Sequence, residues 1–274
     1  MTDTAQTLSR ANHVLIGNYA RQDIVMTRGE GSHVWDSDGR KYLDLFAGFG
    51  GAVLGHSHPA LVKAVSDQAR QLWHVGNTFH TTPQIELGER LNKFAFEGRA
   101  FYCHSGMESN EAACKLARLR GQTSSPKKWK ILSLNKSFHG RSLAMISATG
   151  NPATKSGFEP LVPGFNQVDP GDFEALAKAA DDETAAIILE PIQGEGGINL
   201  YPDHYASRVR KLCDERKITL IFDEVWTCMG RTGEWFGHQI FKDENDQRVI
   251  PDIITMGKAI GGGLPVGVMF ARPE

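Results

Sequence analysis

From residue 99 to the end of the chain, short apolar segments alternate with segments that have the periodicity of amphipathic helices. Continuous apolar strands that alternate with helices are typical of a mostly parallel sheet with helices on both faces. We therefore predict an α/β fold. The predicted strands are Ala100–Cys103, Lys130–Leu134, Ala185–Leu189, Ile218–Phe222, Asp252–Thr255 and Val266–Ala271. The predicted helices are Met107–Arg120, a helical segment near Arg141, and Pro202–Arg216.

The N-terminal part has a different pattern. Residues 1–22 are expected to form a helical or extended arm. Asp38-Gly39 is a strong hairpin signal, because these residues readily adopt positive φ. The strands expected here are Ile24–Arg28, Ser32–Asp36 and Lys41–Asp44, and the helices expected after them are Pro59–Leu72 and Thr82–Phe94.

Composition narrows the class of protein. Of 274 residues, 41% are hydrophobic and 23% are charged, which suits a globular protein with a sizeable core. The formal net charge of −2 and the lack of a long basic run give no sign of a nucleic-acid partner. No apolar segment is long enough to span a membrane. We expect a cytoplasmic protein, because the four cysteines lack a C-x-x-C pair and the first residues resemble neither a signal nor a transit peptide.

Two pairs of residues are candidate metal ligands. His56 and His58 have no third ligand at a useful spacing, and no histidine flanks Glu190 and Glu195. We therefore expect no metal site.

Lys258 and Asp223 each stand at the exit of a predicted buried strand. In parallel sheets ligands collect at the carboxyl ends of the strands. An amine and a carboxylate placed there can hold pyridoxal phosphate: the amine condenses with the aldehyde, and the carboxylate keeps the pyridine nitrogen protonated. A single lysine before a glycine-rich loop is more often a solvated loop residue, so the hypothesis depends on the other motifs.

Three further motifs follow predicted strands. Ser105-Gly106-Met107 opens a helix whose free amides can bind a phosphate, although Ser105 and Glu108 also fit an ordinary capping box. Phe138 can stack on a planar ring and Arg141 can bind a carboxylate, but each alone is more often a core residue or a surface ion pair. The glycine-rich bend from Glu190 to Gly197 has the wrong spacing for a dinucleotide fingerprint.

Together these motifs make the chain resemble the class III, pyridoxal-phosphate-dependent aminotransferases, most closely the acetylornithine and ornithine branch. The resemblance runs from about Gly29 to the end of the chain. Its motifs are Gly29–Asp36, Leu54–Pro59, Asn110–Ala113, Asp223–Val225, Gly230–Gly233 and Gly257–Pro265.

The resemblance implies a fold and a domain organisation. The fold is the large domain of a fold type I enzyme dependent on pyridoxal phosphate, at residues 56–274. Residues 1–55 would form an N-terminal arm and part of a smaller domain. Because family members continue beyond the strand that follows the lysine loop, we expect this chain to be C-terminally incomplete and to lack the C-terminal small domain.

The resemblance also implies the site residues. Lys258 would bind the cofactor covalently and move the proton during catalysis, and Asp223 would pair with the pyridinium. The other implied cofactor-binding residues are Ser105, Gly106 and Met107 at the phosphate, Phe138 on the ring, Val225 and Trp226. Arg141 would bind the substrate carboxylate, and Glu195 resembles the family's gate residue.

Three residues depart from the family pattern. Met107 stands where members of this branch usually have Thr, Trp226 where they commonly have Gln, and Cys228 where they commonly have Gly. A Trp beside the cofactor is expected to change the volume of the pocket and the substrate preference.

The function implied is transamination from N-acetylornithine, ornithine or a similar ω-amino compound to 2-oxoglutarate, which gives an aldehyde and glutamate. Members of the family work as homodimers. Two alternatives stay open: a related class III decarboxylase or aminomutase, and an inactive truncated remnant.

Overall fold

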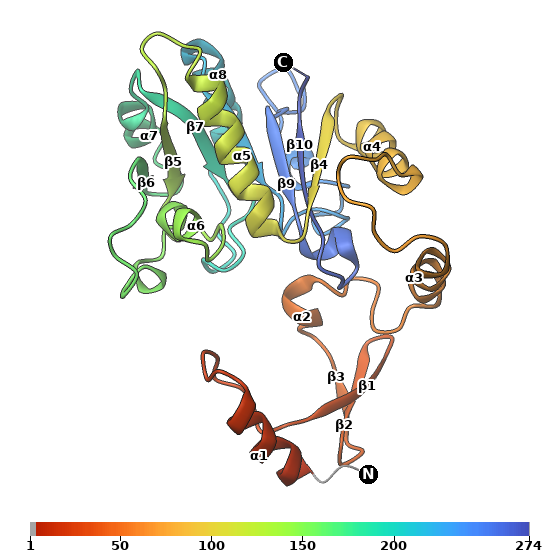
Figure 1. Cartoon of the computed structure of the whole chain (residues 1–274). Coiled ribbons are helices and arrows are strands. Elements are labelled where there is room, and N and C mark those ends of the chain that lie inside the picture. Colours follow the sequence, from red (N-terminus) through yellow and green to blue (C-terminus); the bar gives the residue numbers. More distant parts are fainter. Residues whose placement is uncertain (1–3, 274) are drawn as a thin grey trace. The chain divides into compact units, whose positions relative to one another are not determined.

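The structure is a computed structural model that describes residues 4–273 (Figure 1). The chain divides after Phe79 into two compact units. The domain boundary that we expect after residue 55 stays a prediction.

The first unit contains a small antiparallel sheet with strand order β1-β2-β3. The carboxylate of Asp36 fixes its hairpin turn, because it accepts hydrogen bonds from the amides of Asp38 at 3.0 Å and Arg40 at 2.8 Å. The hairpin predicted at Asp38-Gly39 is thereby confirmed. The elements are α1 (Thr4–Val14), β1 (Met26–Glu30), β2 (His33–Asp36), β3 (Lys41–Leu43), α2 (Ala47–Gly50) and α3 (Pro59–Gln71).

The second unit is built on a seven-stranded sheet of order β4-β10-β9-β8-β7-β5-β6. Only β10 runs antiparallel to its neighbours, so the mostly parallel sheet is confirmed. The strands are β4 (Arg99–Cys103), β5 (Lys130–Leu134), β6 (Phe165–Val168), β7 (Thr184–Leu189), β8 (Thr219–Asp223), β9 (Ile253–Met256) and β10 (Gly267–Ala271).

Helices cover both faces of this sheet, and Figure 1 shows α5 lying across one of them. Side chains alternate between the faces along each strand. On β8, Leu220 and Phe222 join one buried cluster and Ile221 joins the other. The first cluster also contains residues of α4 (Thr82–Phe94), α7 (Phe173–Ala179) and α8 (Tyr205–Arg216), and the second contains residues of α5 (Gly106–Gly121) and α6 (Leu143–Ala148).

Among the strands and α-helices of the second unit, β6 and α7 were not predicted. Strand β6 has the sequence FNQV and lies at the edge of the sheet, so it lacks the continuous apolar character of the central strands. Helix α8 begins at Tyr205 and not at Pro202, because His204 adopts a left-handed conformation with φ of +59°. Short 3-10 turns complete the unit at η1 (Pro152–Thr154), η2 (Gly237–Ile240) and η3 (Lys258–Gly261).

Within residues 4–273, no helix combines the length and the apolar character needed to cross a bilayer.

Candidate active site

The structure brings Lys258 and Asp223 to the same edge of the sheet. Strands β8 and β9 are parallel neighbours, and Asp223 stands opposite Thr255, three residues before Lys258. The loop after β8 then returns toward the lysine, so that the ring centroid of Trp226 lies 4.0 Å from Lys258 Nζ. The amine and the carboxylate therefore emerge from adjacent strand ends.

Asp223 is a buried carboxylate held by three donors. Its Oδ2 accepts hydrogen bonds from Asn110 Nδ2 at 2.7 Å and from His139 Nδ1 at 2.8 Å, while Oδ1 accepts from the Val225 amide at 3.0 Å. Thr255 orients Asn110 by donating to its Oδ1 at 2.6 Å. Each carboxylate oxygen has room for two donors, so Oδ1 can accept one more. Asp223 is 3% exposed, and a cationic N–H is the donor that best suits such a buried charge.

Asn110 and His139 lie in or next to the sequence motifs, but no role was predicted for either residue. Asn110 belongs to the helix face that buries Ala113 and Ala117 against the sheet. A polar side chain on such a face needs a buried partner. A polar residue on this apolar helix face was therefore a signal that could be recognised in the sequence, although the sequence did not identify Asp223 as its partner.

Lys258 has a strained backbone and a perturbed amine. Its φ of +47° lies in the left-handed region, which non-glycine residues rarely adopt and which often marks a functional site. Burial lowers the pKa of Lys258, and the negative charges of Asp223 and Glu195 oppose that shift. A lowered pKa leaves more of the amine neutral and able to act as a nucleophile.

The start of α5 offers free amides. Ser105 Oγ accepts from the Glu108 amide at 3.1 Å, so Ser105 caps the helix as predicted. The Glu108 carboxylate accepts from the His104 amide at 2.9 Å and not from the Ser105 amide that a capping box requires. The amides of Gly106 and Met107 have no acceptor among the described residues. Unpaired amides at a helix N-terminus favour an anion such as a phosphate.

Gly106 is required by close packing. A Cβ atom built on it would lie 2.6 Å from Val225 Cγ2, and one built on Gly257 would lie 2.9 Å from the Cα of Gly106. The start of α5 thus packs directly against the loops that follow β8 and β9.

Met107 supports the neighbouring loop. Its Sδ accepts from the Ser142 amide at 3.1 Å, and a Cβ on Gly140 would lie 2.7 Å from its Cγ. The side chain that replaces the family's threonine is therefore packed against the loop that carries Phe138 and Arg141.

Glu190 joins two loops at this edge. Its Oε1 accepts from the Phe138 amide at 2.9 Å, and its Oε2 accepts from the Gly194 amide at 3.1 Å. Burial raises the pKa of Glu190 to about 7. From the sequence, Glu190 was a candidate only for metal binding, and its contacts with the two loops were not predicted. Among the described residues no cluster of three potential metal ligands occurs, and His56 bonds to Asp44 at 2.7 Å.

The other predicted site residues differ in exposure and contacts. The half-buried Phe138 ring lies 5.7 Å from the guanidinium carbon of the exposed Arg141, and Glu195 is also exposed. Trp226 packs on Gly194, where an added Cβ would lie 2.8 Å from the indole. Cys228 is buried beneath the site with its Sγ 3.7 Å from the Gly257 carbonyl oxygen, and burial raises its pKa to about 12.

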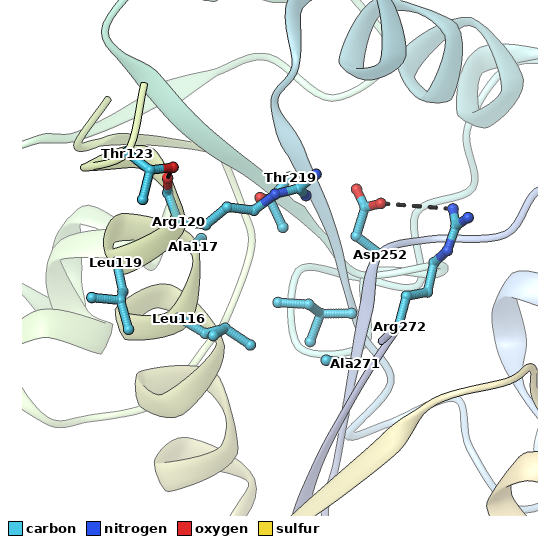
Figure 2. A pocket seen from close by; sticks show the side chains of 10 residues that line it. Leu116, Ala117, Leu119, Arg120, Thr123, Thr219, Asp252, Ala271 and Arg272 are labelled. Carbon is cyan, nitrogen blue, oxygen red and sulfur yellow. Dashed lines mark hydrogen bonds and ion pairs between the residues drawn. The ribbon is translucent and has the colours of Figure 1, made fainter. Parts of the chain in front are cut away.

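A separate pocket of about 290 Å³ lies away from these residues (Figure 2). It is lined by α5 and by the starts of β8 and β9, with Thr219 and Asp252 among its residues. Asp252 pairs there with Arg272 at 3.8 Å. Since Thr219 and Asp223 stand at opposite ends of β8, this pocket is at the far edge of the sheet from Lys258.

A lysine with a lowered pKa, a buried carboxylate and unpaired helix amides at the carboxyl ends of a mostly parallel sheet suit an enzyme that uses pyridoxal phosphate. Residues 17–274 match the family described as aminotransferase class III, and the chain belongs to that family. Pyridoxal phosphate is its cofactor, and transamination is the chemistry of its class.

The comparisons also give individual relatives. The chain is 44% identical over 274 residues to the acetylornithine aminotransferase of Myxococcus xanthus, covering 100% of this chain and 67% of that protein. The crystal structure of N-acetylornithine aminotransferase from Stenotrophomonas maltophilia K279a has a TM-score of 0.77 and 38% identity, covering 97% of this chain and 65% of that one. The taurine:2-oxoglutarate aminotransferase of Bifidobacterium kashiwanohense, solved in complex with PLP and glutamate, has a TM-score of 0.88 and 27% identity, covering 100% and 66%. The chain thus spans about two thirds of the length of these relatives.

Proposed function

We propose that this chain transfers the amine of N-acetylornithine, ornithine or a similar ω-amino compound to 2-oxoglutarate, giving an aldehyde and glutamate. The names of the relatives above support the amino donor, and the taurine:2-oxoglutarate enzyme supports the acceptor. The observation that carries the proposal is the placement of Lys258 and Asp223 at adjacent strand ends, joined through Thr255 and Asn110.

The residues present fit pyridoxal phosphate. The free amides of Gly106 and Met107 suit its phosphate, and the open lone pair on Asp223 Oδ1 suits its pyridinium N–H. The ring of Phe138 suits stacking. When bound, the cofactor supplies an electron sink for the charge that develops on the substrate carbon.

Lys258 has two tasks in this proposal. Its amine would hold the cofactor through the aldehyde group, and a lowered pKa favours the neutral amine that this role needs. The same amine, when it is free, would act as the base that moves a proton at the substrate carbon. Asp223 keeps the pyridine nitrogen protonated throughout, and His139 and Asn110 hold its carboxylate in place.

Arg141 and Glu195 select the substrates. The guanidinium of Arg141 is exposed beside Phe138, so it can bind a substrate carboxylate in a bidentate fork. Glu195 contributes to the electrostatic potential at Lys258 and can pair with an arginine when no second carboxylate is bound.

We also propose that the chain works as a cytoplasmic homodimer. The large exposed apolar side chains are concentrated in residues 4–79, which include Phe46, Phe49 and Trp73. A surface of this kind favours burial against another protein surface, and the family relation makes a second copy the first choice.

The test is a coupled assay for glutamate. With pyridoxal phosphate, N-acetylornithine and 2-oxoglutarate, the chain should form glutamate, and Lys258→Ala should abolish its formation. Lys211→Ala, on α8 away from the site, serves as the control and should not change the rate. Release of carbon dioxide without glutamate would instead identify a decarboxylase, and a folded chain that binds no cofactor would identify a remnant.

A further inference from the structure

Two neighbouring pockets lie at the edge of the large sheet that is far from Lys258. The first is the pocket of about 290 Å³ in Figure 2, and its lining includes the apolar side chains of Leu116, Leu119 and Ile253. The second, of about 320 Å³, is lined by the C-terminal ends of α5 and α8 and is mostly polar. Both pockets are lined by Arg120, Thr123, Thr219, Asp252 and Arg272. An apolar pocket and a polar pocket therefore border on each other.

The polar pocket carries an excess of positive charge. Its lining contains five cationic side chains, Arg120, Lys128, Arg210, Lys217 and Arg272, and two carboxylates, Asp214 and Asp252. Arg210 pairs with both carboxylates, because its Nη2 lies 2.7 Å from Asp214 Oδ1 and its Nη1 lies 2.9 Å from Asp252 Oδ2. Both acids are therefore already paired, and they do not neutralise the other cations of the pocket.

Three of these cations, Arg120, Lys128 and Lys217, form no ion pair with any residue from 4 to 273. Lys128 is only 9% exposed, and its Nζ donates to the carbonyl oxygens of Arg216 and Lys217 at the end of α8. These bonds offset the negative end of the helix dipole. An ammonium group has three N–H donors, so Lys128 keeps one for a ligand.

The cations of the polar pocket repel one another, and several donors there are free. Burial lowers the pKa of Lys128, and the positive charge of Lys217 adds to this shift while Asp182 opposes it. A bound anion would remove this repulsion. The Thr219 hydroxyl has no hydrogen-bond partner among the described residues, and neither has the buried Nε of Arg210. The polar pocket therefore offers charge and donors that suit an anion.

We propose that the two pockets together bind a small organic anion, whose carboxylate or phosphate head group pairs with Arg120 and Lys217 and whose short apolar tail packs on Leu116. A guanidinium binds either head group in a bidentate fork, and an ammonium binds it as a point charge. The ligand is small, because each pocket is near the lower end of ligand-site volumes, about 300 Å³. The site is independent of the proposed function, since it shares no residue with the candidate active site.

Titration calorimetry of the chain with four probes tests the proposed site. Hexanoate has both a charge and a tail, acetate lacks most of the tail, and hexanol lacks the charge. Hexanoate should bind on the order of tenfold more tightly than either of the others, because each of them loses one of the two interactions. Monohexyl phosphate distinguishes the head groups: the probe that binds more tightly, this one or hexanoate, identifies the head group that the site prefers.

Substitutions locate the bound anion. Arg120→Gln should weaken hexanoate binding on the order of tenfold and leave hexanol binding unchanged. Lys115→Gln is the matched control, because Lys115 is an exposed cation of the same helix that lines neither pocket, and it should not change hexanoate binding. Arg141→Gln reports on anions bound at the candidate active site and should also have no effect. Because the probes remove each interaction without a substitution, the comparison holds even if a variant fails to fold.

Three outcomes would overturn the proposed site. Equal binding of hexanoate and acetate, or an equal effect of Arg120→Gln and Lys115→Gln, would show an adventitious ion only. Loss of hexanoate binding in Arg141→Gln but not in Arg120→Gln would place the anion at the candidate active site. The third outcome is that the folded chain shows no saturable binding of hexanoate or of monohexyl phosphate. None of these outcomes depends on glutamate formation, so the proposed function is tested separately.

Discussion

Glu190 is a single buried carboxyl group that holds two loops of the site in place. Its two oxygens accept from the amides of two different loops, and it is 2% exposed. The loops that carry Phe138 and Glu195 are thereby tied to the end of β7. A buried carboxyl group of this kind favours its neutral form.

The stability of the chain should therefore depend on pH through Glu190. The folded pKa of about 7 lies above the ordinary glutamate pKa of 4.5, so the stabilising contribution is fully present below pH 4.5 and declines as pH rises to 7. We expect the free energy of unfolding of Glu190→Gln, relative to that of the wild type, to rise by about 3 kcal/mol across that pH interval, since one pKa unit corresponds to about 1.4 kcal/mol. Urea unfolding at several pH values measures the difference.

Glu174→Gln provides the control, because the Glu174 side chain is 83% exposed and its replacement removes a carboxyl group that is not buried. A Glu190→Gln difference that is constant from pH 4.5 to 7 would contradict the burial argument.

Among single residues, Lys258 and Asp223 could be predicted because each follows a continuous apolar strand. The supporting side chains could not be assigned in the same way. Asn110 and His139 reach Asp223 from elements that are far from it in sequence, and only the packing of α5 and the β5 loop on the sheet brings them together. The roles of the individual site residues at the cofactor stay predictions.

At the scale of elements, helix α5 is placed by its contact with the loops after β8 and β9. That contact leaves no space for a side chain at Gly106. The sequence motif indicated a capped helix, but it gave no sign that the glycine was required by packing. Strand β6 and helix α7 show the opposite limit, because β6 carries little apolar character and α7 is only seven residues long.

Gly106→Ala should lower the free energy of unfolding by about 1–3 kcal/mol, because its Cβ would fall 2.6 Å from Val225 Cγ2. It should also weaken binding of inorganic phosphate at the free amides. Adding Val225→Ala removes the two methyl groups and should restore part of the stability. Thermal or urea unfolding of the single and double variants measures both effects.

A matched substitution separates packing from helix propensity. Gly88 lies inside α4, where an added Cβ would meet only Tyr102 Oη at 3.4 Å. Gly88→Ala should be neutral or stabilising, because alanine favours helices over glycine by about 1 kcal/mol. If both alanine variants behave alike, the packing explanation for Gly106 is wrong.

At the scale of the whole molecule, the apolar core is unevenly distributed between the two units. All of the buried hydrophobic side chains among the described residues lie at Leu91 or beyond. The first unit holds its hairpin through Asp36 and its backbone ladder, with no buried apolar side chain in its described part. Such a unit gains little from the hydrophobic effect to offset its conformational entropy.

Limited proteolysis should therefore cut the isolated chain first within residues 4–79 and leave the segment from β4 to β10 intact. Mass spectrometry of the fragments identifies the cut sites. If the chain dimerises as proposed, protection of residues 4–79 should increase with protein concentration. First cuts within the strands of the large sheet would contradict this distribution of stability.

We propose above all that Lys258 and Asp223 contact opposite edges of one pyridoxal phosphate molecule. A crystal structure of the chain grown with pyridoxal phosphate tests it most directly. We expect continuous density from Lys258 Nζ to the aldehyde carbon, with the pyridine nitrogen within hydrogen-bond distance of Asp223 Oδ1. A cofactor bound elsewhere, or one whose ring nitrogen points away from Asp223, would contradict it.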